Sequence, residues 1–354
     1  MTTVAVVGGG VIGLSIAWRA ARSGHVVTVH DPNPGSGASW VAGGMLAPLS
    51  EGWPGEDHVL SLGAASLDRW PGFADALRTE TDVDVFTAEA SLTVALDAAD
   101  AADLRTVAEW VGERGHEMRL LSRAEIREFE PSLGPKVRLG LLAPTESSVD
   151  NRALVDALRT AATGAGVRFS DGAVHDLADL PDDQVVLAAG SASARLWPGL
   201  PVRPVKGEIL RLRVRPGATP PPQRTIRASV HGRPAYLVPR HDGLVVGATQ
   251  YEASDTQVTV AGVRDLIADA ETIFPALGEY ELFEASAGLR PMTPDNLPMI
   301  GRLSDRVVAA TGHGRNGVLL TPLTVDAVLA ELGGRSLADA KYACPGRITE
   351  ASVG

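Results

Sequence analysis

The first residues whose spacing could do chemistry lie near the N-terminus, where Gly8, Gly10 and Gly13 form the pattern G-x-G-x-x-G. They follow the apolar run 3–7 and begin an apolar-periodic segment, and Asp31 stands 18 residues past Gly13. Such glycines permit a tight turn and a close backbone approach to a pyrophosphate, and the carboxylate can accept a ribose hydroxyl. The pattern predicts a dinucleotide site, without separating FAD from NAD. A glycine-rich turn that binds no ligand is the alternative.

Two arginines stand where they could bind an anion. Arg290 lies in the motif 287–291, between a predicted strand and a turn, and Arg315 lies in 311–318, after the buried-type strand 307–310. A planar guanidinium binds a carboxylate through two parallel hydrogen bonds. Unpaired N–H groups at a helix N-terminus after 311–318 would suit an anionic ring system. The alternatives are a surface arginine beside a proline and a plain strand-to-helix connection.

Tyr236 and His313 are the other side chains within motifs. Tyr236 lies on the predicted strand 235–238, where a core tyrosine with its hydroxyl bound to the backbone is the alternative to a substrate contact. His313 is the only one of eight histidines in a motif, and no histidine pair has metal-ligand spacing, so no metal site is expected. The absence of a P-loop, of G-x-S-x-G and of basic stretches with aromatics disfavours triphosphatases, hydrolases and nucleic-acid binding.

The composition is that of a globular protein with one large domain or two ordinary ones. The 354 residues are 45% hydrophobic and 21% charged, with a net charge of −11. This charge would repel nucleic acid and an anionic substrate alike, so such a substrate needs a specific arginine. Cys344 is the single cysteine, and neither an export signal nor a membrane-spanning run is visible. We therefore expect a cytoplasmic protein without membrane attachment.

Periodicity and turn signals predict alternating strands and helices. The predicted strands are 3–7, 26–30, 91–96, 167–170, 184–189, 208–214, 235–238, 244–246, 279–285 and 307–310. The predicted helices are 11–23, 58–78, 97–114, one beginning with a capping box at 122–125, 151–164, 259–273 and one ending at 332. The stretch 35–50 is rich in Gly, Ala and Ser and reads as loops. This order indicates a parallel nucleotide-binding domain interrupted by antiparallel excursions.

Together the motifs resemble the D-amino-acid-oxidase-like family of FAD enzymes, and within it the glycine oxidases of the thiamine pathway. The resemblance runs in order over nearly the whole chain. It rests on the segments 8–13, 42–46, 204–208, 236–240, 245–249, 287–291 and 312–317.

The resemblance implies an FAD held noncovalently, because 291–299 contains no cysteine that could tether the flavin and Cys344 lies beyond the motif. The implied cofactor-binding residues are Gly8, Gly10, Val11, Ile12 and Gly13 at the pyrophosphate, Asp31 and Pro32 at the ribose, Ser39, Gly43, Gly44 and Met45 toward the flavin, Val174 at the adenine, Gly190, and His313, Gly314, Asn316, Gly317, Val318 and Leu319 around the isoalloxazine.

The same resemblance assigns the catalytic residues. Arg290 would clamp the substrate carboxylate, Tyr236 would donate a hydrogen bond to it, and the backbone at Arg315 would receive the amine. Hydride transfer from the α-carbon to the flavin would give an imine or 2-oxo acid, and dioxygen would reoxidise the flavin to give hydrogen peroxide. Two departures, Gly314 and Gln250, indicate a roomier or more polar pocket than in glycine oxidases.

The expected fold is α/β plus α+β, a Rossmann-like FAD-binding domain with a discontinuous antiparallel-sheet substrate domain. We assign 1–85, 145–200 and 286–354 to the first domain and 86–144 and 201–285 to the second. The implied partners are a small amino acid, dioxygen, a thiazole synthase that would take the imine, and further copies of the chain in a homo-oligomer. A broader D-amino-acid oxidase or dehydrogenase, a nicotinamide-dependent dehydrogenase and a regulatory nucleotide-binding protein without turnover are the alternatives.

Overall fold

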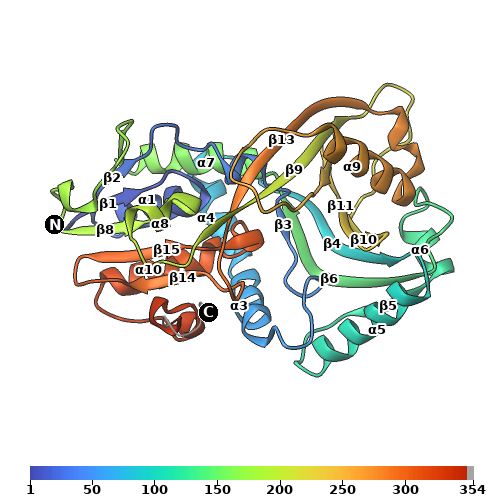
Figure 1. Cartoon of the computed structure of the whole chain (residues 1–354), viewed down its shortest axis with the longest axis horizontal. Helices are drawn as coiled ribbons and strands as arrows, with labels where there is room; N and C mark the ends of the chain where they lie inside the picture. Colours follow the sequence, from blue (N-terminus) through green and yellow to red (C-terminus); the bar gives the residue numbers. More distant parts are fainter. Residues whose placement is uncertain (349–354) are drawn as a thin grey trace.

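The computed structural model describes residues 1–348 and contains two sheets that lie side by side (Figure 1). Sheet A has six strands, all parallel except β14. Their order is β14 (Met299–Arg302), β15 (Val307–Thr311), β8 (Gln184–Leu187), β1 (Thr3–Val7), β2 (Val26–His30) and β7 (Arg168–Ser170). The apolar runs of β1, β8 and β15 are buried, as expected for a parallel sheet covered on both faces.

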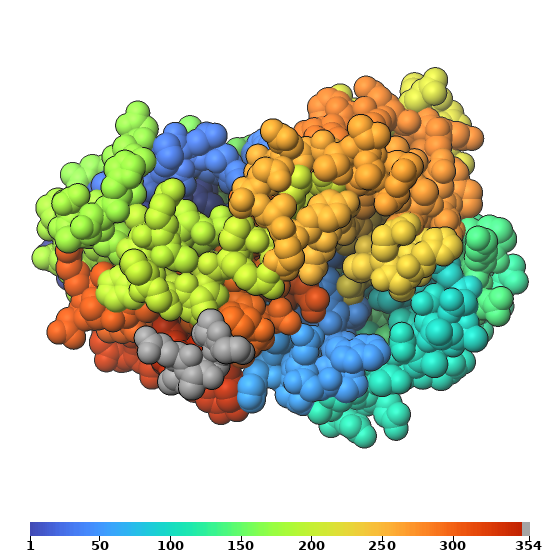
Figure 2. All heavy atoms as spheres, in the orientation of Figure 1, coloured from blue at the N-terminus to red at the C-terminus, as the bar shows by residue number. Residues whose placement is uncertain are grey.

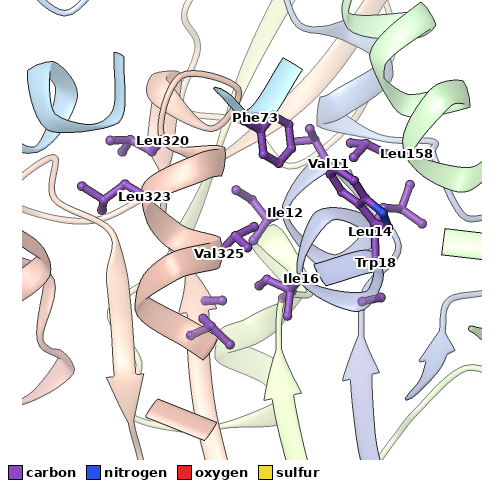
Figure 3. Packing of buried hydrophobic residues seen from close by; sticks show 14 of the residues in the cluster. Val11, Ile12, Leu14, Ile16, Trp18, Phe73, Leu158, Leu320, Leu323 and Val325 are labelled. Carbon is purple, nitrogen blue, oxygen red and sulfur yellow. The ribbon is translucent and has the colours of Figure 1, made fainter. Parts of the chain in front are cut away.

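Helices pack on sheet A because their apolar faces are buried against it. The buried helix α1 (Val11–Arg22) lies between α10 (Thr321–Leu332) on one side and α4 (Trp70–Thr81) and α7 (Asn151–Gly164) on the other. Figure 3 shows this packing around Ile12, Leu14 and Trp18. Full burial of each such side chain contributes about 2 kcal/mol. The core therefore holds α1, and the glycine turn before it, in one position.

Sheet B has nine strands and forms the other half of the molecule. Its strands are antiparallel except for the parallel pair β10 and β4. The order is β13 (Glu281–Met292), β9 (Arg203–Arg213), β12 (Gly243–Gly247), β11 (Arg233–Arg240), β10 (Thr225–Val230), β4 (Phe86–Ala95), β6 (Leu139–Val149) and β3 (Met45–Leu46), with β5 (Arg119–Ser122) beside β6.

The remaining helices cover the edges and faces of the two sheets. They are α2 (Ala38–Val41), α3 (Asp57–Leu67), α5 (Ala98–Gly112), α6 (Arg123–Phe129), α8 (Ser193–Leu196) and α9 (Val260–Ile273), with the 3-10 turns η1 (Leu177–Asp179), η2 (Gly190–Ala192), η3 (Pro275–Glu279), η4 (Gly314–Asn316), η5 (Ala338–Ala343) and η6 (Pro345–Arg347). No helix in residues 1–348 has the length and apolar character needed to cross a bilayer.

Several predicted elements are confirmed and some are wrong. The N-terminal strand–helix–strand unit, helix 151–164 and the capping box are confirmed, and Ser122 N donates to Glu125 Oε2 at 2.7 Å. The predicted helix 58–78 is two helices, α3 and α4. Strand β13 continues to Met292, so Arg290 lies within a strand rather than after one.

Strand β6 was not predicted, because polar residues interrupt its apolar pattern. The structure explains its most unusual residue, the fully buried Glu146. Its Oε1 accepts from the N–H groups of Leu49 and Ser50 at 2.7 and 2.8 Å, and its Oε2 accepts from Ser50 Oγ at 2.7 Å. Burial still raises the pKa of this carboxyl. Glu146 thus holds the loop after β3 against sheet B.

Chain segments enter both halves of the molecule more than once. Sheet A takes strands from 3–30, 168–187 and 299–311, whereas sheet B takes 45–46, 86–149 and 203–292. In Figure 2, blue and red-orange segments from opposite ends of the chain lie on one side, and teal and yellow segments lie on the other. The proposed boundaries at 145 and 286 fall inside β6 and β13. Residues 349–354 of the proposed FAD-binding segment lie outside the described residues.

Candidate active site

The glycine turn after β1 leaves no room for side chains. Gly8 has a φ of +109°, and a Cβ there would clash with the carbonyl oxygen of Ala188 at the end of β8. A Cβ at Gly13 would clash with the carbonyl oxygen of Gly8. The backbone of α1 therefore begins directly against the ends of β1 and β8, as a pyrophosphate site requires.

The N-cap residue of α1 is Gly10, which has no side chain to cap the first turn of the helix. Val11 N donates to Ser39 Oγ at 2.9 Å, which brings α2 to this helix end. A helix N-terminus has N–H groups without partners in the helix and a partial positive charge, both suited to a phosphate. We call the turn formed by Gly8, Gly10 and Gly13 the glycine cradle. The cradle and the helix end fit the diphosphate of a dinucleotide.

Asp31 is held beside this turn at the end of β2. Its Oδ2 accepts from Gly9 N at 2.6 Å, and its Oδ1 accepts from Asn33 N at 2.8 Å. An ionised carboxylate has about four acceptor positions, so two such bonds leave capacity for ribose hydroxyls. Pro32 follows directly. The predicted roles of Asp31 and Pro32 stay predictions, and this geometry is compatible with them.

The other residues predicted for the nucleotide half lie beyond the carboxyl ends of parallel strands. Val174 follows β7, and the carbonyl of Ser170 there accepts from Asp31 N at 3.0 Å. Gly190 follows β8, and its carbonyl accepts from Thr311 Oγ1 at 3.1 Å. This is the edge at which open α/β sheets bind ligands.

Buried polar side chains hold the segment 39–44, which connects the cradle to sheet B. Asn151 Nδ2 donates to the carbonyls of Ser39 and Trp40 at 2.8 and 2.9 Å. Arg240 Nη2 donates to the carbonyl of Gly43 at 2.8 Å. At Gly44, with φ +81°, a Cβ would clash with the backbone of β6, and Met45 next to it pairs with that strand. These contacts therefore fix the position of the segment 39–44.

Arg240 is a functional candidate for which the sequence predicted no role. Burial lowers the pKa of Arg240 to about 10, against the opposing effect of Asp150 at 3.7 Å. Burial also lowers the pKa of Arg211, whose Nη2 donates to Asn151 Oδ1 at 2.9 Å. Arg240 stays charged at neutral pH and binds protein carbonyls. Its place at the end of the motif 236–240 was the only sequence signal.

Tyr236 lies where Gly43 and Gly247 leave space for its ring. A Cβ at Gly43 would come within 2.9 Å of the ring, and one at Gly247 would clash with the hydroxyl. Burial raises the pKa of Tyr236, and the charge of Arg290 partly opposes that rise. The phenol therefore stays protonated at neutral pH and can donate a hydrogen bond.

Arg290 lies beside this tyrosine and has no carboxylate of residues 1–348 within ion-pair distance. Its Nη1 donates to the carbonyl of Thr249 at 3.1 Å. The guanidinium lies across Gly207 on the neighbouring strand β9, where any Cβ would clash with it. The remaining donors of this guanidinium can bind a ligand carboxylate.

Arg315 differs from Arg290, because its side chain has protein partners. Its Nε is 3.2 Å from Glu51 and its Nη2 is 3.6 Å from Glu56. Glu51 also pairs with Arg227 at 3.1 Å, and Arg227 stands opposite Tyr236 in the register of β10 and β11. These charges join sheet B to the turn η4. Neither Glu51 nor Arg227 lies in a motif, so sequence reasoning missed both.

The turn 313–319 is positioned from sheet A and α10. His313 is buried, its Nε2 lies 2.9 Å from Thr324 Oγ1, and burial lowers its pKa to about 3. Gly314 has a φ of +56°, and a Cβ there would come within 2.9 Å of Met292 Sδ. Asn316, Gly317 and Val318 continue this turn toward α10. Leu319 is anchored through its carbonyl, which accepts from Trp70 Nε1 at 2.9 Å.

A glycine turn that fits a diphosphate lies on the parallel sheet A, and the fixed segment 39–44 joins it to an arginine and a tyrosine on sheet B. This arrangement is that of a dinucleotide-dependent oxidoreductase. Comparisons with known proteins give the particular family. The family described as FAD dependent oxidoreductase (DAO) matches residues 3–332. The chain belongs to this family, and FAD is its cofactor.

Individual relatives agree with this assignment. The chain is 35% identical over 351 residues to a bifunctional ThiO/ThiG protein of Synechocystis sp., covering 93% of this chain and 51% of that one. It is 33% identical to a glycine oxidase of Geobacillus kaustophilus, covering 91% and 90%. The crystal structure of the G. kaustophilus glycine oxidase matches with a TM-score of 0.90 at 30% identity, covering 99% and 100%. The chain thus spans about half the length of the ThiO/ThiG relatives.

The glycine cradle predicts a specific loss of cofactor affinity. Gly8→Ala introduces a Cβ against Ala188, whereas Gly24→Ala has a similar φ of +92° but open space around its Cβ. Each alanine has to adopt a left-handed conformation, at a cost of about 1–2 kcal/mol. Only Gly8→Ala should raise the Kd for FAD, by about tenfold or more. Reconstitution of apoprotein followed by flavin absorbance measures this. Equal Kd values in the two variants would contradict the cradle.

The buried His313 predicts a dependence of stability on pH. The folded protein keeps this imidazole neutral down to about pH 3, whereas the unfolded chain protonates it near pH 6.5. Its contribution is therefore complete above pH 6.5 and is lost as the pH falls. Between about pH 7 and about pH 5, the wild type should lose about 2 kcal/mol more unfolding free energy than His313→Gln. Urea unfolding at both values measures the difference, and equal losses would contradict it.

Proposed function

We propose that this protein oxidises glycine or another small amino acid to the imine, with dioxygen as electron acceptor and hydrogen peroxide as product. The observation that carries the proposal is the guanidinium of Arg290, which lies beside the protonated hydroxyl of Tyr236 and pairs with no carboxylate of residues 1–348. Relatives named glycine oxidase, matched over nearly their whole length, support this substrate class.

The charge pattern of the site suits an amino-acid carboxylate. Arg290 supplies parallel N–H donors, and Tyr236 supplies a neutral O–H donor from the adjacent part of sheet B. Both groups are held by packing across glycines, so little rearrangement is needed on binding. The backbone at Arg315 would receive the substrate amine, and the ion pairs of its side chain with Glu51 and Glu56 would hold that turn.

FAD, when bound, would supply the acceptor for the hydride that leaves the substrate α-carbon, while the amine nitrogen loses a proton as the imine forms. The chain fixes the α-carbon by its carboxylate and its amine, and orientation of this kind supplies much of the rate enhancement. His313 and the turn 313–319 would border the isoalloxazine, with the predicted FAD residues along the cradle and the segment 39–45. We propose that FAD is held there noncovalently, because Cys344 is exposed and follows η5.

The partners and surroundings follow from the same assignment. We propose a cytoplasmic enzyme whose imine product passes to a thiazole synthase in thiamine biosynthesis. The relatives named ThiO/ThiG support this partner, because in their names two activities share one chain. A homo-oligomer of this chain is part of the same proposal.

The substrate clamp predicts the result of removing one guanidinium. Arg290→Met should lower kcat/KM for glycine by about a hundredfold, mainly through KM, because a buried charge-assisted bond to the carboxylate is lost. Arg233→Met, on the same sheet but paired with Asp269, should leave kcat/KM unchanged. Peroxide formation with glycine, sarcosine, D-alanine and D-proline measures activity and substrate range. Wild-type kinetics in Arg290→Met would contradict the clamp, and turnover of none of these compounds would contradict the function.

A further inference from the structure

Strand β9 carries two charged residues on the face turned away from Arg290. Side chains alternate along a strand, so Lys206 and Glu208 point opposite to Gly207, on which the guanidinium of Arg290 lies. Both charged residues are buried, Glu208 completely. Their face is covered by α9, with the apolar Leu210 and Leu212 farther along the strand. Two buried charges at this position need an explanation beyond packing.

The backbone of these residues binds the segment that follows β12. Lys206 N donates to the carbonyl of Tyr251, and Tyr251 N donates to the carbonyl of Lys206, both at 2.9 Å. Glu208 N donates to Thr249 Oγ1 at 2.8 Å, and Thr249 N donates to the carbonyl of Glu208 at 3.2 Å. Residues 249–251 therefore continue along β9 beyond the end of β12, where Lys206 and Tyr251 form an isolated β-bridge.

The two side chains bind the same segment farther along. Glu208 Oε1 accepts from Thr259 N at 2.7 Å, and Lys206 Nζ donates to Asp255 Oδ1 at 2.7 Å. Lys206 Nζ also lies 3.8 Å from Glu208 Oε1. The hydrogen bond from Lys206 lowers the pKa of Asp255. The segment 249–259, which has little regular structure of its own, is thus attached at its start, middle and end.

The first turn of helix α9 leaves space for the carboxylate of Glu208. A Cβ at Gly262 would clash with Glu208 Oε2, so a glycine is needed in the first turn. Thr259 is the N-cap of the helix, and its Oγ1 accepts from Gly262 N at 3.0 Å. The same threonine gives its own N–H to Glu208. The carboxylate therefore fixes the point at which the segment ends and α9 begins.

We propose that Lys206 and Glu208 are positioning residues for the substrate clamp. The connection is Thr249, whose carbonyl accepts from Arg290 Nη1 at 3.1 Å while its N–H and Oγ1 bind the backbone of Glu208. Lys206 and Glu208 hold the segment 249–259 on one face of β9. The Thr249 carbonyl of that segment orients the Arg290 guanidinium on the other face. This inference rests on the proposed role of Arg290 in binding a carboxylate. Buried ion pairs add little net stability, so their geometric effect is the property to test.

Sheet B offers a matched control in Glu130. This buried carboxylate also binds a loop, because it accepts from Gln223 N at 3.1 Å and Arg224 N at 3.0 Å. It pairs with Arg224 at 3.2 Å. Glu130 follows α6 and, among residues 1–348, forms hydrogen bonds and an ion pair with Gln223 and Arg224 but none with Thr249 or Arg290. Glu130→Ala should therefore reproduce the loss of stability in Glu208→Ala without affecting the clamp.

The test is titration of the oxidised holoenzyme with glycolate, a carboxylate without an amine, followed by the change in flavin absorbance. We expect Arg290→Met to raise the Kd about tenfold or more and Glu208→Ala to raise it about fivefold, with Glu130→Ala unchanged. The double variant Glu208→Ala/Arg290→Met should bind no more weakly than Arg290→Met alone, because both changes remove the same interaction. In turnover, Glu208→Ala should raise KM and leave kcat near the wild-type value.

Conservative variants keep the test decisive if Glu208→Ala does not fold. Glu208→Gln retains an oxygen for Thr259 N–H and should restore most of the glycolate affinity, whereas Lys206→Met should lower it. Wild-type affinity in Glu208→Ala and Lys206→Met, with Arg290→Met impaired, would overturn this inference and leave the proposed function standing. Equal weakening in Glu130→Ala would overturn it as well. An unchanged Kd in Arg290→Met would instead contradict the carboxylate clamp itself.

Discussion

The site depends on one guanidinium, that of Arg290, held over a glycine between two strands without a carboxylate partner in residues 1–348. Its position requires Gly207 beneath it and the Thr249 carbonyl beside it. Tyr236 lies close enough for the charge of Arg290 to oppose the rise of its pKa. A chain with a net charge of −11 repels anions at long range, so this local charge has to supply the attraction.

The arginines around the site divide into two groups by their partners. Arg240 and Arg211 are buried and bind protein carbonyl or amide oxygens, so they fix the segment 39–44 between the cradle and sheet B. Arg227 and Arg315 share Glu51 and join sheet B to the turn η4. These partnered arginines fix the position of sheet B relative to sheet A. In the function that we propose, this fixed arrangement allows Arg290 to hold a substrate next to a cofactor bound on sheet A.

Local patterns in the sequence predicted the N-terminal unit, helix α7, the capping box and the motifs that carry Arg290 and Tyr236. They failed where the structure depends on contacts between distant segments. Strand β6 was missed because Glu146 interrupts its pattern, and the loop at 49–50, far away in the sequence, supplies the hydrogen bonds to that carboxylate. Glu51 and Arg227 are 176 positions apart, so no spacing rule could pair them. The proposed roles of Lys206 and Glu208 likewise depend on a loop that binds β9 only after folding.

In the function that we propose, this protein recognises its amine substrate by the carboxylate, which binds Arg290. The decisive measurement is flavin absorbance after anaerobic mixing of the holoenzyme with glycine or with methylamine, because the two amines differ only in the carboxylate. We expect glycine to bleach the flavin at a rate that saturates with concentration, and methylamine to leave the flavin oxidised. Flavin reduction by methylamine at a comparable rate would show that the carboxylate is not needed for recognition. A flavin that stays oxidised with glycine and every other small amino acid would rule out the proposed oxidation.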